Sequence, residues 1–294
     1  MTWHGQINRT IWEISEAIKK NPEDTRHRRE LLRAQFLQQF EHDKALHVPR
    51  DDRTFMFLHE GEGPVVLLLH GSAGTPAEFR ELGNHLYAHG ISVYCPRLTR
   101  ETGRNREATW ESWVTQSQIA LEAVTTCSPM PYVCGLSLGG TVAMILRNQI
   151  PVKGVILLAP ALFPRLSLKA RVLQVARAVT PTVFYHFAGW NGEVLRAMEY
   201  ARRNAGEIDV PLLALQAADD NRLSPRGLKL LRRHAKHSDT EVRLLDAGSH
   251  VLTRGASKDE VFNAVAAFVD RGSRAAGWTP PRQGSGEDAR SDPS

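Results

Sequence analysis

The sequence predicts an α/β protein with a mostly parallel sheet, helices on both faces of the sheet and an inserted helical cap. From residue 54 onward, short continuous apolar runs alternate with segments of helical periodicity. Continuous apolar runs are typical of strands that are covered on both faces, as in parallel sheets. The alternation breaks once, between Pro160 and Asp209, where two helical patterns follow each other without a clear strand between them.

The elements can be assigned one after another along the chain. The strand candidates are TFMFL, PVVLLL, ISVYCP, PYVCG, VKGVILLAP, VPLLALQA and TEVRLLD. The helix candidates outside the insertion are AEFRELGNHLYAHG, WESWVTQSQIALEAVTT, SLGGTVAMILRN, PRGLKLLRRHA and KDEVFNAVAAFVDR. Right-handed crossovers between parallel strands then place helices on both faces of the sheet.

The pattern divides the chain into four parts. We expect a helical N-terminal arm over 1–53, a core formed by 54–160 and 209–271, a helical cap over 161–208, and a disordered tail over 272–294, which is rich in Pro, Gly and Ser. Three aromatic residues of the cap either line an acyl pocket or form a small core of the cap itself, namely Tyr185, Phe187 and Trp190.

The arm carries an apolar stripe that needs a partner surface. The stripe has a spacing of three to four residues and comprises Leu31, Leu32, Gln35, Phe36, Gln39 and Phe40. Its partner is either the main domain or a second subunit, which would make the protein a homo-oligomer through the arm.

Composition and charge exclude several classes of function. The net charge of +5 comes from scattered arginines without a long basic run, which argues against nucleic-acid binding. The three cysteines show no zinc-site spacing and no even disulfide set, and nothing in the sequence indicates a metal or cofactor. The longest apolar run, 155–163, is far shorter than the roughly 20 residues of a membrane span. No apolar signal segment stands at the N-terminus, so we expect a cytoplasmic protein.

A serine lies between two glycines after the strand candidate PYVC. The stretch reads Gly135-Leu136-Ser137-Leu138-Gly139 and leads into an apolar helical segment. A sharp turn from strand to helix leaves no room for side chains on either side of the turn residue, so glycines flank it. This is the G-x-S-x-G nucleophile elbow, which exposes the serine hydroxyl.

Polar residues also follow three other strand candidates. His70-Gly71-Ser72 follows the first buried strand, the pair Asp219 and Asp220 follows VPLLALQA, and His250 follows TEVRLLD. Ligand sites of open parallel sheets lie beyond the carboxyl ends of the strands, so these residues should meet Ser137 there.

These positions fit a serine nucleophile with its base and acid. His250 would accept the Ser137 proton as the hydroxyl attacks a carbonyl, and an aspartate would orient the imidazole. The backbone N–H groups of Leu138 and Ser72 would stabilise the developing oxyanion. Since Asp219 and Asp220 are adjacent, only one of them can point at the imidazole.

At these residues the chain resembles the α/β-hydrolase superfamily, and within it the small bacterial carboxylesterases and monoacylglycerol lipases. The resemblance covers about residues 54–271 and rests on HGSAGTPAEFRELGNHLYAHG, CGLSLGG, VKGVILLAPAL, LQAADDNRLSP and GSHVLT. It implies the α/β-hydrolase fold, a Ser-Asp-His triad, hydrolysis of carboxylic esters through an acyl-enzyme, no cofactor and a small cap. It also favours Asp220 as the acid, because DNRLSP resembles the family's aspartate loop and Gln216 stands where the family often has a polar residue.

The sequence departs from the family in three places. Ser72 stands where an aromatic or bulky residue often follows His-Gly, the cap matches poorly, and the arm has no recognised counterpart. These departures affect the substrate more than the reaction.

We therefore predict a serine carboxylesterase that acts on a small-molecule ester. The alternatives on the same triad are a monoacylglycerol lipase, a C–C bond hydrolase or an acyltransferase. A non-catalytic binding protein on the same fold is an alternative of another class, but a binder has no need of the aspartate.

Overall fold

A seven-stranded sheet forms the centre of the molecule, with the strand order β1-β3-β2-β4-β5-β6-β7. The computed structural model describes residues 3–21, 25–60, 62–98, 108–128, 130–165 and 190–280. The strands are β1 Phe55–Phe57, β2 Val65–Leu69, β3 Ser92–Cys95, β4 Tyr132–Leu136, β5 Gly154–Leu158, β6 Leu212–Ala217 and β7 Thr240–Leu245. Only β1 runs antiparallel, to β3, while β2 through β7 are parallel. The predicted mostly parallel α/β sheet is confirmed.

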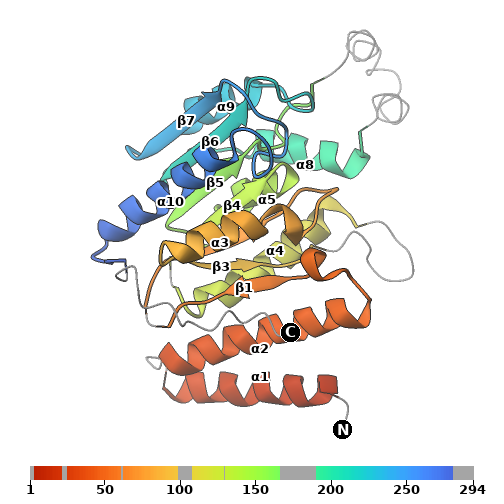
Figure 1. Cartoon of the computed structure of the whole chain (residues 1–294), viewed down its shortest axis with the longest axis vertical. Helices are drawn as coiled ribbons and strands as arrows, with labels where there is room; N and C mark the ends of the chain where they lie inside the picture. Colours follow the sequence, from red (N-terminus) through yellow and green to blue (C-terminus); the bar gives the residue numbers. More distant parts are fainter. Residues whose placement is uncertain are drawn as a thin grey trace.

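The strands from β1 to β6 are buried along their whole length, because helices cover both faces of the sheet. These helices are α3 Arg80–Ala88, α4 Trp110–Thr125, α5 Leu138–Leu146, α8 Gly192–Arg203, α9 Arg226–His234 and α10 Lys258–Arg274. Helices α3 and α10 pack against each other in front of the strands, and α4 and α5 lie behind them (Figure 1). The edge strand β7 is only partly covered, and Leu244 on it is exposed.

The N-terminal arm consists of two antiparallel helices, α1 Trp3–Lys20 and α2 Thr25–Ala45, followed by the short 3₁₀-helix η1 Arg50–Asp52. Helix α2 packs on β1 and α4, and α1 lies on the outer side of α2 (Figure 1). Leu32, Phe36 and Phe40 of α2 are almost completely buried and belong to the same hydrophobic core as the sheet. The main domain of the same chain is therefore the partner surface of the predicted stripe.

The chain is ordered beyond the predicted end of the core, so the expected boundary of the tail at residue 272 is wrong. Helix α10 continues to Arg274, and Tyr132 of β4 contacts its buried Ser273. Trp278 then packs against the core and beside Gly63. The helix continues because Gly272 and Ser273 of its last turn still contact Tyr132 of β4, which the composition of the tail does not reveal.

The second helix of the predicted cap belongs to the helical layer of the core. Helix α8 packs against α5 and α4 and buries Val194, Leu195, Ala197, Met198 and Ala201. It supplies the crossover between the parallel neighbours β5 and β6. The cap expected over 161–208 is thus too long at its C-terminal side. The predicted helix LSLKARVLQVARAV, together with Tyr185 and Phe187, lies outside the described residues.

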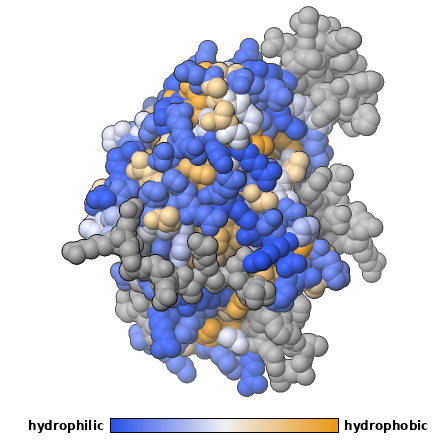
Figure 2. Space-filling view, viewed as in Figure 1, coloured by the Kyte–Doolittle hydropathy of each residue, from blue (hydrophilic) through white to orange (hydrophobic). Residues whose placement is uncertain are grey.

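The visible surface of the molecule is mainly hydrophilic (Figure 2). Within the described part of the chain, no helix combines the length and apolarity that a membrane crossing requires.

Leu32→Ala and Leu37→Ala form a matched pair that tests the packing of the arm. Both leucines lie on α2, but Leu32 is fully buried whereas Leu37 is 37% exposed. Leu32→Ala should lower the free energy of unfolding by about 2–5 kcal/mol, because it leaves a cavity in the shared core. Leu37→Ala should cost less than about 1 kcal/mol. Urea denaturation measures both values, and equal small losses would show that the arm does not share the core.

Candidate active site

Ser137 occupies a strained turn between β4 and α5. Its backbone angles are φ 55° and ψ −116°, a conformation that residues with a side chain rarely adopt. The chain can turn this sharply because glycines flank the serine. A Cβ on Gly135 would overlap the backbone of Gly139, and a Cβ on Gly139 would overlap the carbonyl of Leu69. The sequence pattern therefore predicts both the turn and the reason for its glycines.

Hydrogen bonds from the neighbouring strand end hold this turn in place. The Ser137 N–H donates to the carbonyl of Leu158 at 2.9 Å, and the Ser137 carbonyl accepts the N–H of Ala161 at 3.0 Å. The end of β5 thus braces both sides of the serine. Strained backbone persists only where the surroundings fix it in this way.

His250 brings an imidazole to the serine from the loop after β7. Its Nε2 lies 3.0 Å from Ser137 Oγ, and its Nδ1 lies 3.1 Å from Asp220 Oδ2. The side chain of Asp220 is fully buried and that of His250 is 14% exposed. The structure therefore brings together the three side chains that were predicted to form a triad.

Asp220 is built to remain a carboxylate. Burial alone would raise its pKa, but the hydrogen bond to His250 and the N–H groups of Leu223 and Arg222 outweigh this effect and lower it. The side-chain amide of Gln216 donates a further hydrogen bond at 3.3 Å. Asp219 is exposed instead, so the structure places Asp220 and not Asp219 against the imidazole.

The loop of residues 70–75, between β2 and the short 3₁₀-helix η2 Pro76–Glu78, passes beside the serine. A Cβ on Gly71 would lie 3.4 Å from Ser137 Cβ, so glycine lets this loop approach the elbow. Leu138 is the first residue of α5, where N–H groups have no acceptor within the helix. Among the described residues, the N–H groups of Ser72 and Leu138 have no hydrogen-bond acceptor.

Glu78 is a further residue of this region that the sequence did not indicate. Its carboxylate folds back into the turn and accepts the N–H of Gly71 at 3.4 Å. It lies so close to Gly74 that a Cβ there would overlap it. Burial raises the pKa of Glu78, and Gly71, Arg254 and His250 offset this only in part. Gly71 and Gly74 are the features of the sequence that could have indicated Glu78, because the space beside a glycine must be filled by another side chain.

Of the three aromatic residues predicted to line an acyl pocket or form the core of the cap, Trp190 is the one that the structure describes. It is partly buried against the core, and the guanidinium of Arg222 lies 5.5 Å from its ring centroid. Arg222 also donates its backbone N–H to Asp220, so Trp190 lies near the triad. In the part of the chain that the structure describes, no cluster of three or more His, Cys, Asp or Glu side chains could hold a metal ion.

A family model described as the alpha/beta hydrolase family matches residues 66–283. The chain belongs to this family. The match spans β2 to α10 and contains every residue of the site.

Known proteins similar to this hydrolase point to ester chemistry. A carboxylesterase of Bacillus subtilis (strain 168) is 23% identical over 238 residues, which cover 73% of this chain and 96% of the relative. A solved structure of one of two metagenome-derived lipolytic enzymes, LipS and LipT, matches with a TM-score of 0.62 and 20% identity, covering 75% of this chain and 98% of that one. The monoacylglycerol lipase of Paleococcus ferrophilus matches with a TM-score of 0.57 and 18% identity, covering 74% of this chain and 99% of that one. The hydrolase family and these relatives support ester hydrolysis in the broad sense.

Glu78→Gln tests the buried carboxylate of the 70–75 loop through pH. The glutamine oxygen can still accept the Gly71 N–H, but the side chain no longer ionises. A carboxyl group with a raised folded pKa contributes stability below its ordinary value of 4.5, and this is lost as the pH rises through the folded value. The Tm of the variant should therefore exceed that of the wild type by a margin that grows from pH 4.5 toward pH 8. A Tm difference that is constant over this range would show that Glu78 is not held in a desolvated site.

Proposed function

We propose that this hydrolase is a serine carboxylesterase that cleaves its substrate through an acyl-enzyme. The proposal is carried by one observation, the continuous hydrogen-bonded chain from Ser137 Oγ through His250 to the buried Asp220. A serine hydroxyl is a weak nucleophile at neutral pH and needs a base within hydrogen-bond distance. The imidazole satisfies this requirement at 3.0 Å.

The geometry also supports one protonation pattern for the resting imidazole. Asp220 is an ionised acceptor, so His250 Nδ1 carries the proton and donates it to that carboxylate. Nε2 is then free to accept the Ser137 proton as Oγ attacks the ester carbonyl. The imidazolium that results lies against a buried negative charge, which stabilises it.

Acylation and deacylation then use the same groups in turn. The Ser137 oxygen bonds to the carbonyl carbon, the oxyanion forms, and His250 returns the proton to the leaving alcohol as the C–O bond breaks. Water attacks the acyl-enzyme in the second half, giving its proton to His250, and the proton returns to Ser137 as the acid leaves. The free N–H groups of Ser72 and Leu138 are the proposed oxyanion donors, and losing one such donor typically costs 10²–10³ in rate.

An acyl or aryl ester of modest size is the proposed substrate. A monoacylglycerol is the second candidate, because structures with the same fold include two monoacylglycerol lipases, from Paleococcus ferrophilus and Saccharomyces cerevisiae. A panel of p-nitrophenyl esters of increasing chain length, monoacylglycerols and vinylogous diketones separates these activities from C–C bond hydrolysis. Added alcohol acceptors would reveal acyl transfer. If the protein hydrolysed none of these esters, the proposal would be overturned.

Ser137→Ala should abolish both turnover and covalent labelling. A fluorophosphonate reacts with an activated serine, so intact-mass spectrometry should show one label per wild-type chain and none on the variant. Ser112→Ala, on the exposed face of α4, is the control and should label and turn over like the wild type. An active, labelled Ser137→Ala protein would move the nucleophile elsewhere.

Asp220→Asn and Asp219→Asn form a matched pair of adjacent residues. Asp220→Asn should lower kcat by several orders of magnitude, on the scale of about 10⁴ known for the aspartate of a serine-protease triad. Asp219→Asn should change kcat less than about threefold, because its side chain is exposed. Initial-rate kinetics on folded protein decide between them, and the reverse ranking would make Asp219 the acid.

A further inference from the structure

The N-terminal arm is joined to the main domain by buried polar groups as well as by its apolar stripe. Asp43, near the end of α2, is only 1% exposed although it carries a carboxylate. Its Oδ2 accepts hydrogen bonds from the N–H and the hydroxyl of Thr54, both at 2.8 Å, and its Oδ1 pairs with Arg97 Nε at 2.7 Å. A buried carboxylate is tolerated only when its oxygens are hydrogen-bonded in this way, so these partners must stay in place.

The partners of Asp43 fix the segment that follows β3. The Arg97 N–H donates to the Thr54 hydroxyl at 3.0 Å. The Arg97 carbonyl accepts the side-chain amide of Gln39, one turn before Asp43 on α2, at 3.1 Å. Helix α2 therefore holds the side chain and both backbone groups of Arg97, directly or through Thr54.

His70 carries this connection from the segment after β3 into the 70–75 loop. The N–H of Leu98 donates to His70 Nε2 at 2.9 Å, so this nitrogen carries no proton. His70 Nδ1 must then carry the proton and donate it to the carbonyl of Gly71, also at 2.9 Å. Burial lowers the pKa of His70 to about 4, which keeps this neutral bridge intact at neutral pH. The bridge ends one residue before Ser72.

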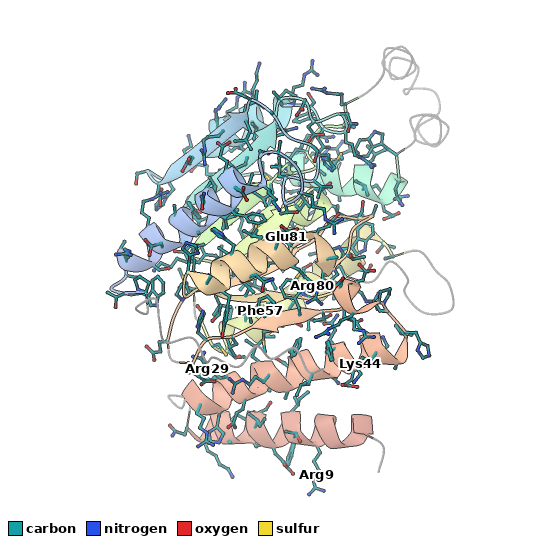
Figure 3. All side chains as sticks on the ribbon, in the orientation of Figure 1. Arg9, Arg29, Lys44, Phe57, Arg80 and Glu81 are labelled. Atoms are coloured by element: carbon teal, nitrogen blue, oxygen red, sulfur yellow. The ribbon has the colours of Figure 1, made fainter. Side chains whose placement is uncertain are left out.

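A second connection reaches the other end of the same loop. The hydroxyl of Thr75 donates to Asp52 Oδ1 at 2.6 Å. Arg80, labelled in Figure 3, extends from α3 to the same part of the arm and donates to the carbonyls of Arg50 and Asp51 at 2.8 Å each. Both ends of the 70–75 loop are thus hydrogen-bonded, directly or in steps, to the C-terminal part of the arm.

We propose that Asp43 and Asp52 of the N-terminal arm are positioning residues that hold the 70–75 loop, and with it the Ser72 N–H, in register with Ser137. This inference rests on the proposed function, because it assigns the arm a part in oxyanion stabilisation. A donor contributes to catalysis only when it is aimed in advance at the developing charge. The arm therefore acts on the rate of the reaction as well as on folding.

The test uses variants of the whole chain of residues 1–294, arm included, that remove single side-chain groups. Asp52→Ala and Thr75→Val break the connection at Thr75, and Thr75→Ser keeps its hydroxyl. Asp51→Ala is the matched control, because Asp51 is exposed and offers only its backbone carbonyl to Arg80. Asp43→Asn tests the longer connection and should also speed exchange of residues 70–75; if it does not fold, Gln39→Ala, which removes the hydrogen bond to the Arg97 carbonyl, tests the same connection.

Two readouts separate positioning from general stability. Amide hydrogen exchange of the peptide covering residues 70–75 should become about tenfold faster in Asp52→Ala and Thr75→Val, while exchange of α5 and α10 should stay the same. On the best ester of the substrate panel, the kcat of these two variants should fall about tenfold, while KM should stay within twofold of the wild-type value. This loss is smaller than the 10²–10³ that removal of an entire oxyanion donor typically costs. Thr75→Ser and Asp51→Ala should match the wild type, and Asp52→Ala combined with Thr75→Val should be no worse than either alone.

Unchanged loop exchange in both Asp52→Ala and Thr75→Val would overturn the inference, whatever the activity of the protein. Faster exchange with an unchanged kcat would also overturn it. A wild-type protein that hydrolyses no ester would instead overturn the proposed function, and the exchange data would still report whether the arm holds the loop.

Discussion

The site depends on a steric constraint at the turn from β4 to α5. Gly135 and Gly139 have no room for a Cβ, and Ser137 between them is held at a positive φ. Such a conformation costs roughly 1–3 kcal/mol and must be balanced elsewhere. Here the balance comes from the completely buried helix α5 and from the end of β5, which hydrogen-bonds the serine on both sides. The strain therefore places the hydroxyl outside the sheet, where residues from later strands can reach it.

Two buried carboxylates, Asp220 and Asp43, hold loops of the main domain in place. The Oδ1 atom of Asp220 accepts hydrogen bonds from backbone N–H groups of its own loop, and its Oδ2 atom faces His250 Nδ1. Asp43 accepts two hydrogen bonds from Thr54 and pairs with Arg97. In each case both oxygens of a carboxylate that is costly to bury accept hydrogen bonds, which favours a single arrangement of the loop. The two carboxylates differ in their partners. His250, the partner of Asp220, can gain or lose a proton during a reaction, whereas Arg97, the partner of Asp43, stays charged.

The sheet and the predicted triad residues could be found in the sequence because both produce local patterns. Strands buried on both faces appear as short apolar runs, and the elbow requires its glycines at fixed spacing. The stripe of α2 predicted a partner surface, but only the tertiary structure shows that β1 and α4 supply it. Helix α8 has the periodicity of any amphipathic helix, so its sequence could not show whether it packs on the core or on a cap. The contacts of Glu78, His70 and Asp43 could not be predicted from the sequence. Their hydrogen-bond partners are either distant along the chain or come within reach only once a turn has formed.

We propose that the strained turn makes Ser137 the residue that carries the acyl group. Rapid acid quenching during turnover of a p-nitrophenyl ester, followed by peptide mass spectrometry, identifies the acylated residue. We expect an acyl adduct on the peptide containing Ser137, which forms with a burst of p-nitrophenol and decays at the turnover rate. Acylation of another residue, or turnover with a burst that leaves Ser137 unmodified, would contradict it.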